Sequence, residues 1–321
     1  MTSEKSVQTD EQSPRPKIPR LGAAASGLVG LLLVGALFVI PLFGLLIAPL
    51  GCLPVLHFQS GGTPGFRAWG PPAALLAVAA MAGFAGIGLP LLAAYSLLVV
   101  VPSATVDLWT RAKWSEGRWV AVATIIGLIG TLAVVASVAS PHTPMEAVAA
   151  WMRSSSEEIG ELYSAWGLTE GSAELVLDAA EQAASWVLPS VPVAYLVAVL
   201  FWVRPRLPVL GLPVEVGDFE AYRNDDWLAA AFVIGGVGTL LLSGIARWAA
   251  INLLVVVLIL YFVQGLAMIR AHLARWIGRG WLVRWGVVLL CVQGPMPLLV
   301  AALGVADSFH PLRPQPDNNG G

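Results

Sequence analysis

The chain has 321 residues, of which 57% are hydrophobic and 12% are charged, and its formal net charge is -2. Soluble domains average about 25% charged residues, so the composition excludes an ordinary soluble protein. The small net charge excludes a strongly basic nucleic-acid-binding face. The two cysteines, Cys52 and Cys291, lie in apolar stretches, where we expect small buried side chains and neither a disulfide nor a thiolate metal site.

The first twenty residues mix charged residues with prolines and contain few apolar side chains. We expect this tail, residues 1–20, to be disordered and cytoplasmic. The apolar run that follows, 21–56, is much longer than the core of about 7 to 15 residues in a cleavable signal peptide. The insertion signal should therefore remain in the protein as a helix.

Long apolar stretches recur along the chain and predict an all-α, polytopic transmembrane helix bundle. A crossing of the roughly 30 Å hydrocarbon layer takes about 20 residues. The uncharged blocks 21–56 and 71–106 are longer than that and contain prolines, so each predicts a helical hairpin. We predict about nine spans (eight to nine) in a single transmembrane domain over 21–305, followed by a polar tail at 306–321. The predicted spans are 21–40, 42–57, 71–88, 90–106, 119–140, 187–203, 227–246, 251–269 and 285–305.

The distribution of charge predicts the orientation of these spans. Lysines and arginines gather in four segments, 1–20, 107–118, 204–226 and 270–284, which share one side if both long blocks cross twice. The positive-inside rule makes that side cytoplasmic, with an extracytoplasmic C-terminus, in a bacterial inner membrane. Region 141–186 is acidic, and its apolar residues recur at helical spacing. We expect an extracytoplasmic amphipathic helical segment there, with a solvated acidic face rather than a calcium site.

The sequence gives little support for enzymatic chemistry. No Asp, Glu, Lys or Arg falls inside a predicted span, which disfavours a proton-driven transporter. The four histidines are scattered without metal-ligand spacing, and phosphate-binding glycine loops and nucleophile motifs are absent from the sequence. We therefore expect no catalytic residues, no cofactor and no metal.

A few polar positions inside or beside the last spans are candidates for a ligand-facing surface. Tyr261, Gly265, Met268 and His272 share one helical stripe, with Gln264 beside it, and Asn252 lies about 120° from Gln264 around the helix. These side chains either line a site for a small polar ligand or hydrogen-bond neighbouring helices. The second interpretation is the plainer one.

Two sequence features suggest unusual helix packing. The run Gln293 to Pro297 would free backbone carbonyls near the middle of the last predicted span, and broken helices of this kind build sites in transporters. Many membrane helices simply kink at proline. Gly22, Ser26 and Gly30 form a ridge of small residues on the first span, suited to close approach of another helix, either within this chain or from a partner.

The segment AINLLVVVLILYFVQGLAMIRAHLARW, 250–276, followed by a proline-broken span and the ending LGVADSFHPLRP, resembles the YybS-like family of bacterial membrane proteins of unknown function. The positions that match the family's pattern are Asn252, Gln264, Gly265, Asp307 and Arg313. That family is distantly similar to the membrane subunits of energy-coupling-factor vitamin transporters and to the rod-shape protein MreD. The resemblance implies a compact helical membrane domain whose partners supply energy or scaffold.

These observations favour an integral membrane protein that is not an enzyme. The first hypothesis is a binding or transport component for a small solute or lipid. The alternative is a structural or scaffold protein in envelope assembly or cell-shape machinery, which acts through other membrane proteins. In both cases the bilayer is the main partner, and no nucleic acid is expected.

Overall fold

The computed structural model describes residues 21–61, 70–85, 89–139, 142–146, 149–150, 183–276, 286, 289–291 and 293–310. Helices account for 85% of these residues, and no strand occurs among them. The predicted all-helical class is thereby confirmed. The predicted tail at 1–20 and residues 151–182 of the acidic region lie outside the described residues.

The N-terminal part of the chain folds into paired helices. Helix α1 (Ala23–Val39) is followed by α2 (Pro41–Ile47), η1 (Ala48–Gly51) and α3 (Cys52–Ser60), which together form one bent apolar stretch. Helix α5 (Gly70–Ala85) precedes α6 (Leu89–Tyr95), η2 (Ser96–Val100) and α7 (Val101–Ala112), a second continuous stretch in which η2 is a π-helical turn. Pro41 is the first residue of α2, where its missing N–H costs no hydrogen bond. Pro49 and Pro102 lie inside the two stretches, at the 3-10 turn η1 and just after the π-helical turn η2, because proline interrupts regular α-helical hydrogen bonding.

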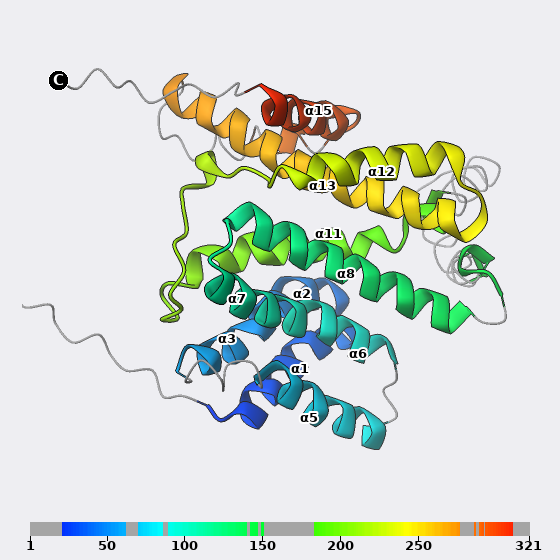
Figure 1. Cartoon of the computed structure of the whole chain (residues 1–321). Helices are drawn as coiled ribbons and strands as arrows, with labels where there is room; N and C mark the ends of the chain where they lie inside the picture. The colour runs from blue at the N-terminus through cyan, green and yellow to red at the C-terminus, as the bar shows by residue number, and fades with distance from the viewer. Residues whose placement is uncertain are drawn as a thin grey trace, which may run out of the picture.

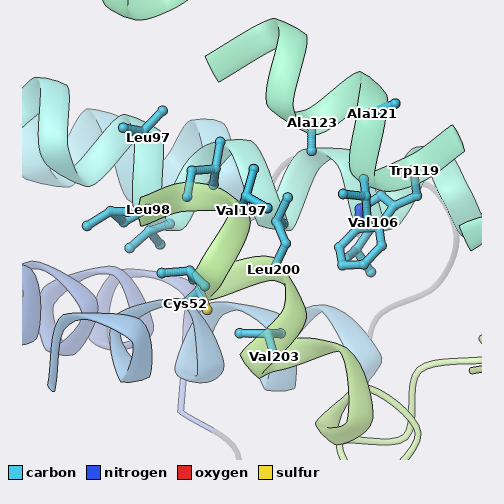
Figure 2. Packing of buried hydrophobic residues seen from close by; sticks show 14 of the residues in the cluster. Cys52, Leu97, Leu98, Val106, Trp119, Ala121, Ala123, Val197, Leu200 and Val203 are labelled. Carbon is cyan, nitrogen blue, oxygen red and sulfur yellow. The ribbon is translucent and has the colours of Figure 1, made fainter. Parts of the chain in front are cut away.

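Helix α11 (Ser190–Val203) lies at the centre of the bundle, between α8 (Glu116–Ala139) and the C-terminal helices (Figure 1). Its residues Val193, Leu196, Leu200 and Val203 are completely buried. Figure 2 shows Val197, Leu200 and Val203 among side chains from the N-terminal helices and from α8. Val191 and Ala198 are exposed, but most of this apolar helix is enclosed, which is typical of the interior of a membrane bundle.

The C-terminal part is built on a long hairpin, formed by α12 (Trp227–Leu241) and α13 (Gly244–Trp276), with α15 (Met296–Phe309) packed against α13 (Figure 1). The predicted spans 227–246 and 251–269 leave residues 247–250 between them, but the structure turns at residues 242–243 and helix α13 runs through Arg247 and Trp248. Gly244 adopts a φ of 58° at this turn, a conformation that glycine takes without strain. Neither Arg247 nor Trp248 is a residue type that breaks a helix, as proline and glycine are.

The segment between α11 and α12, residues 204–226, is called the linker here. Apart from the short 3-10 turns η3 (Arg204–Arg206) and η4 (Phe219–Ala221), it has no regular helix. Ion pairs and hydrogen bonds attach it to the start of α8 and to α13 and α15.

Four helical stretches among the described residues are long and apolar enough to cross a membrane: Pro41–Ser60, Leu89–Ala112, Glu116–Ser137 and Gly244–Leu273. Shorter apolar helices occur at Ala23–Val39, Gly70–Ala80, Trp227–Leu241 and Met296–Phe309. The chain is thus a helical membrane protein. The number of crossings stays a prediction.

Candidate functional site

Asn252 joins the beginning of α13 to the beginning of α11. Its side-chain oxygen accepts a hydrogen bond from Ser190 at 2.7 Å, and its amide nitrogen donates to the carbonyls of Trp186 and Trp248 at 2.8 and 2.9 Å. Trp248 in turn donates from its indole nitrogen to the carbonyl of Ser185 at 3.0 Å. Because Asn252 is completely buried, its polar atoms are used in contacts between chain segments.

Gln264 lies in a buried polar junction where α13, α15 and the linker meet. Its side-chain oxygen accepts a hydrogen bond from the backbone N–H of Asn224 at 3.0 Å. Its amide nitrogen donates to Asp307 at 2.9 Å and to the Ser308 hydroxyl at 3.2 Å. Gln264, Asn224 and Asp307 are at most 5% exposed, so this junction is shielded from solvent.

The linker side chains extend the junction. Asn224 donates from its amide to the carbonyl of Leu260 at 3.0 Å, and its side-chain oxygen accepts the Tyr222 hydroxyl at 2.8 Å. Burial raises the pKa of the Tyr222 phenol, and the nearby Glu116 carboxylate raises it further. Tyr222 therefore remains a neutral hydrogen-bond donor throughout the physiological pH range.

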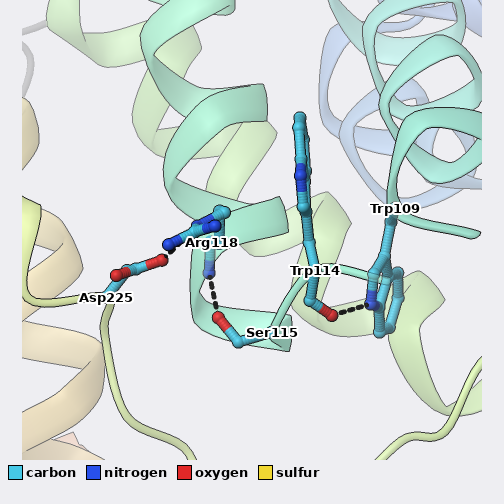
Figure 3. Close-up of polar contacts among 5 residues, drawn as sticks. All are labelled: Trp109, Trp114, Ser115, Arg118 and Asp225. Atoms are coloured by element: carbon cyan, nitrogen blue, oxygen red, sulfur yellow. Dashed lines mark hydrogen bonds and ion pairs between the residues drawn. The ribbon is translucent and has the colours of Figure 1, made fainter. Parts of the chain in front are cut away.

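Three ion pairs attach the linker to neighbouring helices, two of them at the start of α8 and one near the end of α13. Arg204 forms an ion pair with Glu116, with a 2.9 Å contact from Nη2 to Oε2, and both side chains are largely buried. Arg118 pairs with Asp225 of the linker at 2.5 Å (Figure 3). Arg270 pairs with Glu220 at 2.6 Å, with more exposed side chains. These pairs hold the linker to α8 and α13.

Helices α13 and α15 approach each other closely beside Gln264. A methyl group added at Gly304 would overlap the carbonyl oxygen of Tyr261, and one added at Gly265 would overlap that of Val300. Glycine is needed at both positions because backbone atoms occupy the space of a Cβ. Tyr261 itself is buried and makes an edge-to-face contact with Phe232 of α12.

The remaining predicted positions do not join this junction. The Nδ1 atom of His272 lies 2.9 Å from the carbonyl of Met268, within its own helix. Gln293 is exposed in the turn before α15. Within the predicted ridge, Ser26 and Gly30 are buried and Gly30 packs against the carbonyl of Gly51, whereas the space around Gly22 is open. A ligand-facing role for these residues stays a prediction.

Several junction residues are not predicted at a buried site from the sequence, because residues 204–226 lie outside the predicted spans and residues 306–321 are assigned to a polar tail. Helix α15 continues to Phe309, so Asp307 belongs to a helix and not to the polar tail. The spacing of Val300, Gly304 and Asp307, which are all buried, follows one helical face and is the signal that could have placed Asp307 inside. Nothing in the local pattern of the linker indicates that Tyr222 and Asn224 are buried.

An apolar groove lies elsewhere, between α8 and the stretch from α6 to α7, and has a volume of about 200 Å³. Its walls include Leu92, Ser96 and Val101 on one side and Gly127, Gly130 and Val134 on the other. The π-helical turn η2 contributes Ser96 and Leu97 to this wall, and turns of this type often occur at functional sites. Gly130 is exposed, and the space where its side chain would lie is open.

Among the described residues, no group of three or more His, Cys, Asp and Glu could hold a metal ion. The expectation that the protein needs no metal stays a prediction.

Comparison with curated proteins and with solved structures found no match. A family model described as a predicted membrane protein, DUF2232, matches residues 28–308. This match covers most of the chain, from α1 to the end of α15, and includes both the groove and the polar junction. The chain therefore belongs to the predicted membrane protein family DUF2232.

Proposed function

We propose that this protein is a non-enzymatic lipid-binding component of the membrane, and that the hydrocarbon chain of a lipid occupies the groove between α6 and α8. The carrying observation is the groove itself: an open, apolar space of about 200 Å³ on a membrane-embedded helix pair. Exposed Leu89 belongs to its wall, and Ile126 and Ile129 are exposed on the same helix as Gly127. The groove is therefore continuous with the surface that faces lipid.

The polar stripe on α13 gives weaker support to a small polar ligand. The hydrogen-bonding atoms of Asn252 and of Gln264 are engaged with neighbouring segments of the chain. A polar solute would have to displace these contacts, which are buried. A hydrocarbon chain can enter the groove without breaking a hydrogen bond, because the Thr131 hydroxyl there is bonded to the carbonyl of Gly127.

The position of the groove along α8 indicates that the bound lipid would belong to the leaflet opposite the linker. Glu116, at the start of α8, pairs with Arg204 of the linker. The groove residues Gly127 and Val134 lie 11 and 18 residues further along α8, or about 16 and 27 Å at 1.5 Å per residue. In a hydrocarbon layer of roughly 30 Å, these residues occupy the far half.

A substitution of Gly130, which lines the groove, tests the proposal. A Cβ added at Gly130 meets no atom within 4 Å, and Gly130 belongs to the wall of the groove, so we expect the larger side chain of Gly130→Leu to occupy part of the groove. The matched control is Gly236→Leu on α12, another helical glycine with open space around it and outside the groove. Both proteins would be purified in mild detergent, and their bound lipids measured by native mass spectrometry.

We expect wild type and Gly236→Leu to retain a lipid that Gly130→Leu has lost. Equal lipid retention in all three proteins would contradict the proposed site. Equal thermal unfolding of the two variants would show that the difference comes from binding and not from folding.

We also propose that the linker side of the molecule faces the cytoplasm of a bacterial cell and that the protein resides in the inner membrane. The support is the clustering of basic residues at Arg111, Lys113, Arg118 and the linker. Residues 250–276 resemble YybS-like proteins, which are distantly similar to transporter subunits. This resemblance supports a role as a binding component.

The scaffold hypothesis remains the alternative, and it predicts protein partners in the envelope. Its ridge on α1 is less available than the sequence suggests, since Ser26 and Gly30 face the interior of this chain. Photo-crosslinking groups introduced at exposed Leu32 on α1 and at exposed Leu240 on α12 would distinguish the scaffold hypothesis from the lipid-binding proposal. Reproducible capture of one envelope protein supports a scaffold, whereas capture of lipid alone argues against it.

A further inference from the structure

The end of α13 and the end of α15 lie on the same side of the molecule. Helix α13 leaves the bundle on the linker side, because Arg270 near its end pairs with Glu220 of the linker. The end of α15 also lies on that side, where Arg223 of the linker donates to the carbonyl of Ser308 at 3.0 Å. The chain between these two ends therefore crosses the membrane an even number of times or not at all.

Helix α15 crosses α13 and does not run along its full length. Val300 and Gly304 meet α13 at Gly265 and Tyr261, and Asp307 then contacts Gln264. The cited contacts of the eight residues from Val300 to Asp307 thus fall on little more than one turn of α13, from Tyr261 to Gly265. Figure 1 shows α15 against one part of the much longer α13.

The length of residues 285–309 also argues against two full crossings. These 25 residues would span about 37 Å as one helix, whereas two crossings of a hydrocarbon layer of roughly 30 Å need about 60 Å. Before α15 the chain turns at 293–295, where Gly294 has a φ of 55° and Met296 donates to the carbonyl of Gln293 at 3.2 Å. Such a turn allows the chain to reverse direction.

We propose that the chain after α13 returns to the linker side as a hairpin, with the exposed turn at Gln293 to Pro295 as its tip and α15 as its returning half. The chain then crosses the membrane eight times, and its two termini share a side. The nine-crossing arrangement expected from the sequence would instead put the C-terminus opposite the linker. The hairpin does not depend on the lipid groove, which lies on other helices.

The packing of α15 holds this part of the chain against α13 and the linker. Gly265 and Gly304 let α15 approach α13 closely, and the Gln264 side chain bonds both α15 and the linker. The polar junction thereby fastens the returning half of the hairpin to the linker side.

Single cysteines at exposed positions test the hairpin in the full-length chain. The background protein carries Cys52→Ala and Cys291→Ala, since these two native cysteines are the only ones in the sequence. Lys113→Cys marks the linker side of α8, Glu146→Cys marks the opposite side beyond the end of α8, and His310→Cys follows α15. Each variant is labelled with a membrane-impermeant maleimide, in intact spheroplasts and in inverted membrane vesicles.

We expect His310→Cys to react in the same preparation as Lys113→Cys, and Glu146→Cys to react in the other. Reaction of His310→Cys together with Glu146→Cys would overturn the hairpin. Protection of His310→Cys in both preparations would also overturn it, because the proposal places this residue at an aqueous surface. All three substitutions replace exposed side chains, so the bundle should fold in each variant.

Discussion

Gln264 and Asp307 are hydrogen-bonded at 2.9 Å across the contact between α13 and α15, although they are 43 residues apart in the sequence. The same glutamine bonds the backbone of Asn224 in the linker. One side chain therefore connects three segments whose sequence patterns give no sign of a common site. The stability of the C-terminal part should depend on it.

Replacing Gln264 by leucine should destabilise the protein. The substitution keeps the approximate volume but leaves the Asn224 N–H and one Asp307 oxygen without the glutamine partner. Loss of a partner for a buried polar group costs about 1 to 3 kcal/mol. Thermal unfolding in detergent should show a lower midpoint for Gln264→Leu than for wild type. Gln293→Leu, at an exposed glutamine, is the control, and equal midpoints for the two variants would contradict a structural role of the junction.

Asp307 offers a graded version of the same test. Asp307→Asn retains an oxygen that can accept the hydrogen bond from Gln264, whereas Asp307→Leu does not. We expect the asparagine variant to be the more stable of the two. The reverse order would show that the contact at 2.9 Å contributes little.

Gly304 should be intolerant of even one added methyl group. A Cβ there would overlap the Tyr261 carbonyl and lie 3.0 Å from the Gly265 nitrogen, and overpacking of this kind costs about 1 to 3 kcal/mol. Gly304→Ala should therefore unfold at a lower temperature than wild type. Gly236→Ala, where the space is open, should be neutral or stabilising by up to about 1 kcal/mol, because alanine favours the helix. Equal effects at both glycines would mean that α15 does not approach α13 this closely.

The buried pair of Glu116 and Arg204 should behave differently from the exposed pair of Glu220 and Arg270. Removing one partner of a buried pair costs about 3 to 5 kcal/mol, whereas exposed pairs contribute about 0 to 1 kcal/mol. The relative exposures of the side chains are 6% and 14% in the first pair and 45% and 30% in the second. We expect Glu116→Gln to lower the unfolding midpoint far more than Glu220→Gln.

A double variant serves as the control for the buried pair. Glu116→Gln combined with Arg204→Met removes both charges, and its cost should be smaller than the sum of the two single costs. Additive effects would show that the two side chains do not interact.

The apolar pattern predicts the helical class well, because each membrane helix is encoded locally by a run of about 20 apolar residues. It is less informative at the ends of helices, as the turn at residues 242–243 shows. It also treats every apolar block as a crossing. Residues 285–305 are predicted as a span for this reason, whereas the contact of Ser308 with the linker residue Arg223 supports our proposal that this part of the chain returns to the linker side.

The polar junction could be predicted only in part. Asn252 and Gln264 stand out because a polar side chain within an apolar run needs a partner. Asp307 lies at the end of an apolar run, and its spacing from Val300 and Gly304 follows one helical face. Asn224 and Tyr222 lie among polar neighbours in the sequence, so nothing local marks these two as buried. Their burial arises from tertiary contacts of the linker with α13 and α15, which no periodicity encodes.

The raised pKa of Tyr222 gives a prediction about alkaline pH. Its phenol is buried and donates to Asn224 at 2.8 Å, so folding favours the neutral form over the phenolate. In the unfolded chain tyrosine titrates near pH 10. A group whose pKa is raised by folding contributes stability below its unfolded pKa, and that contribution is lost as the pH rises from there toward the folded pKa. The unfolding midpoint of wild type should therefore fall more steeply above about pH 10 than that of Tyr222→Phe, which lacks the titrating group. Parallel curves for the two proteins, measured in the same detergent between pH 8 and 11, would contradict the burial of this phenol.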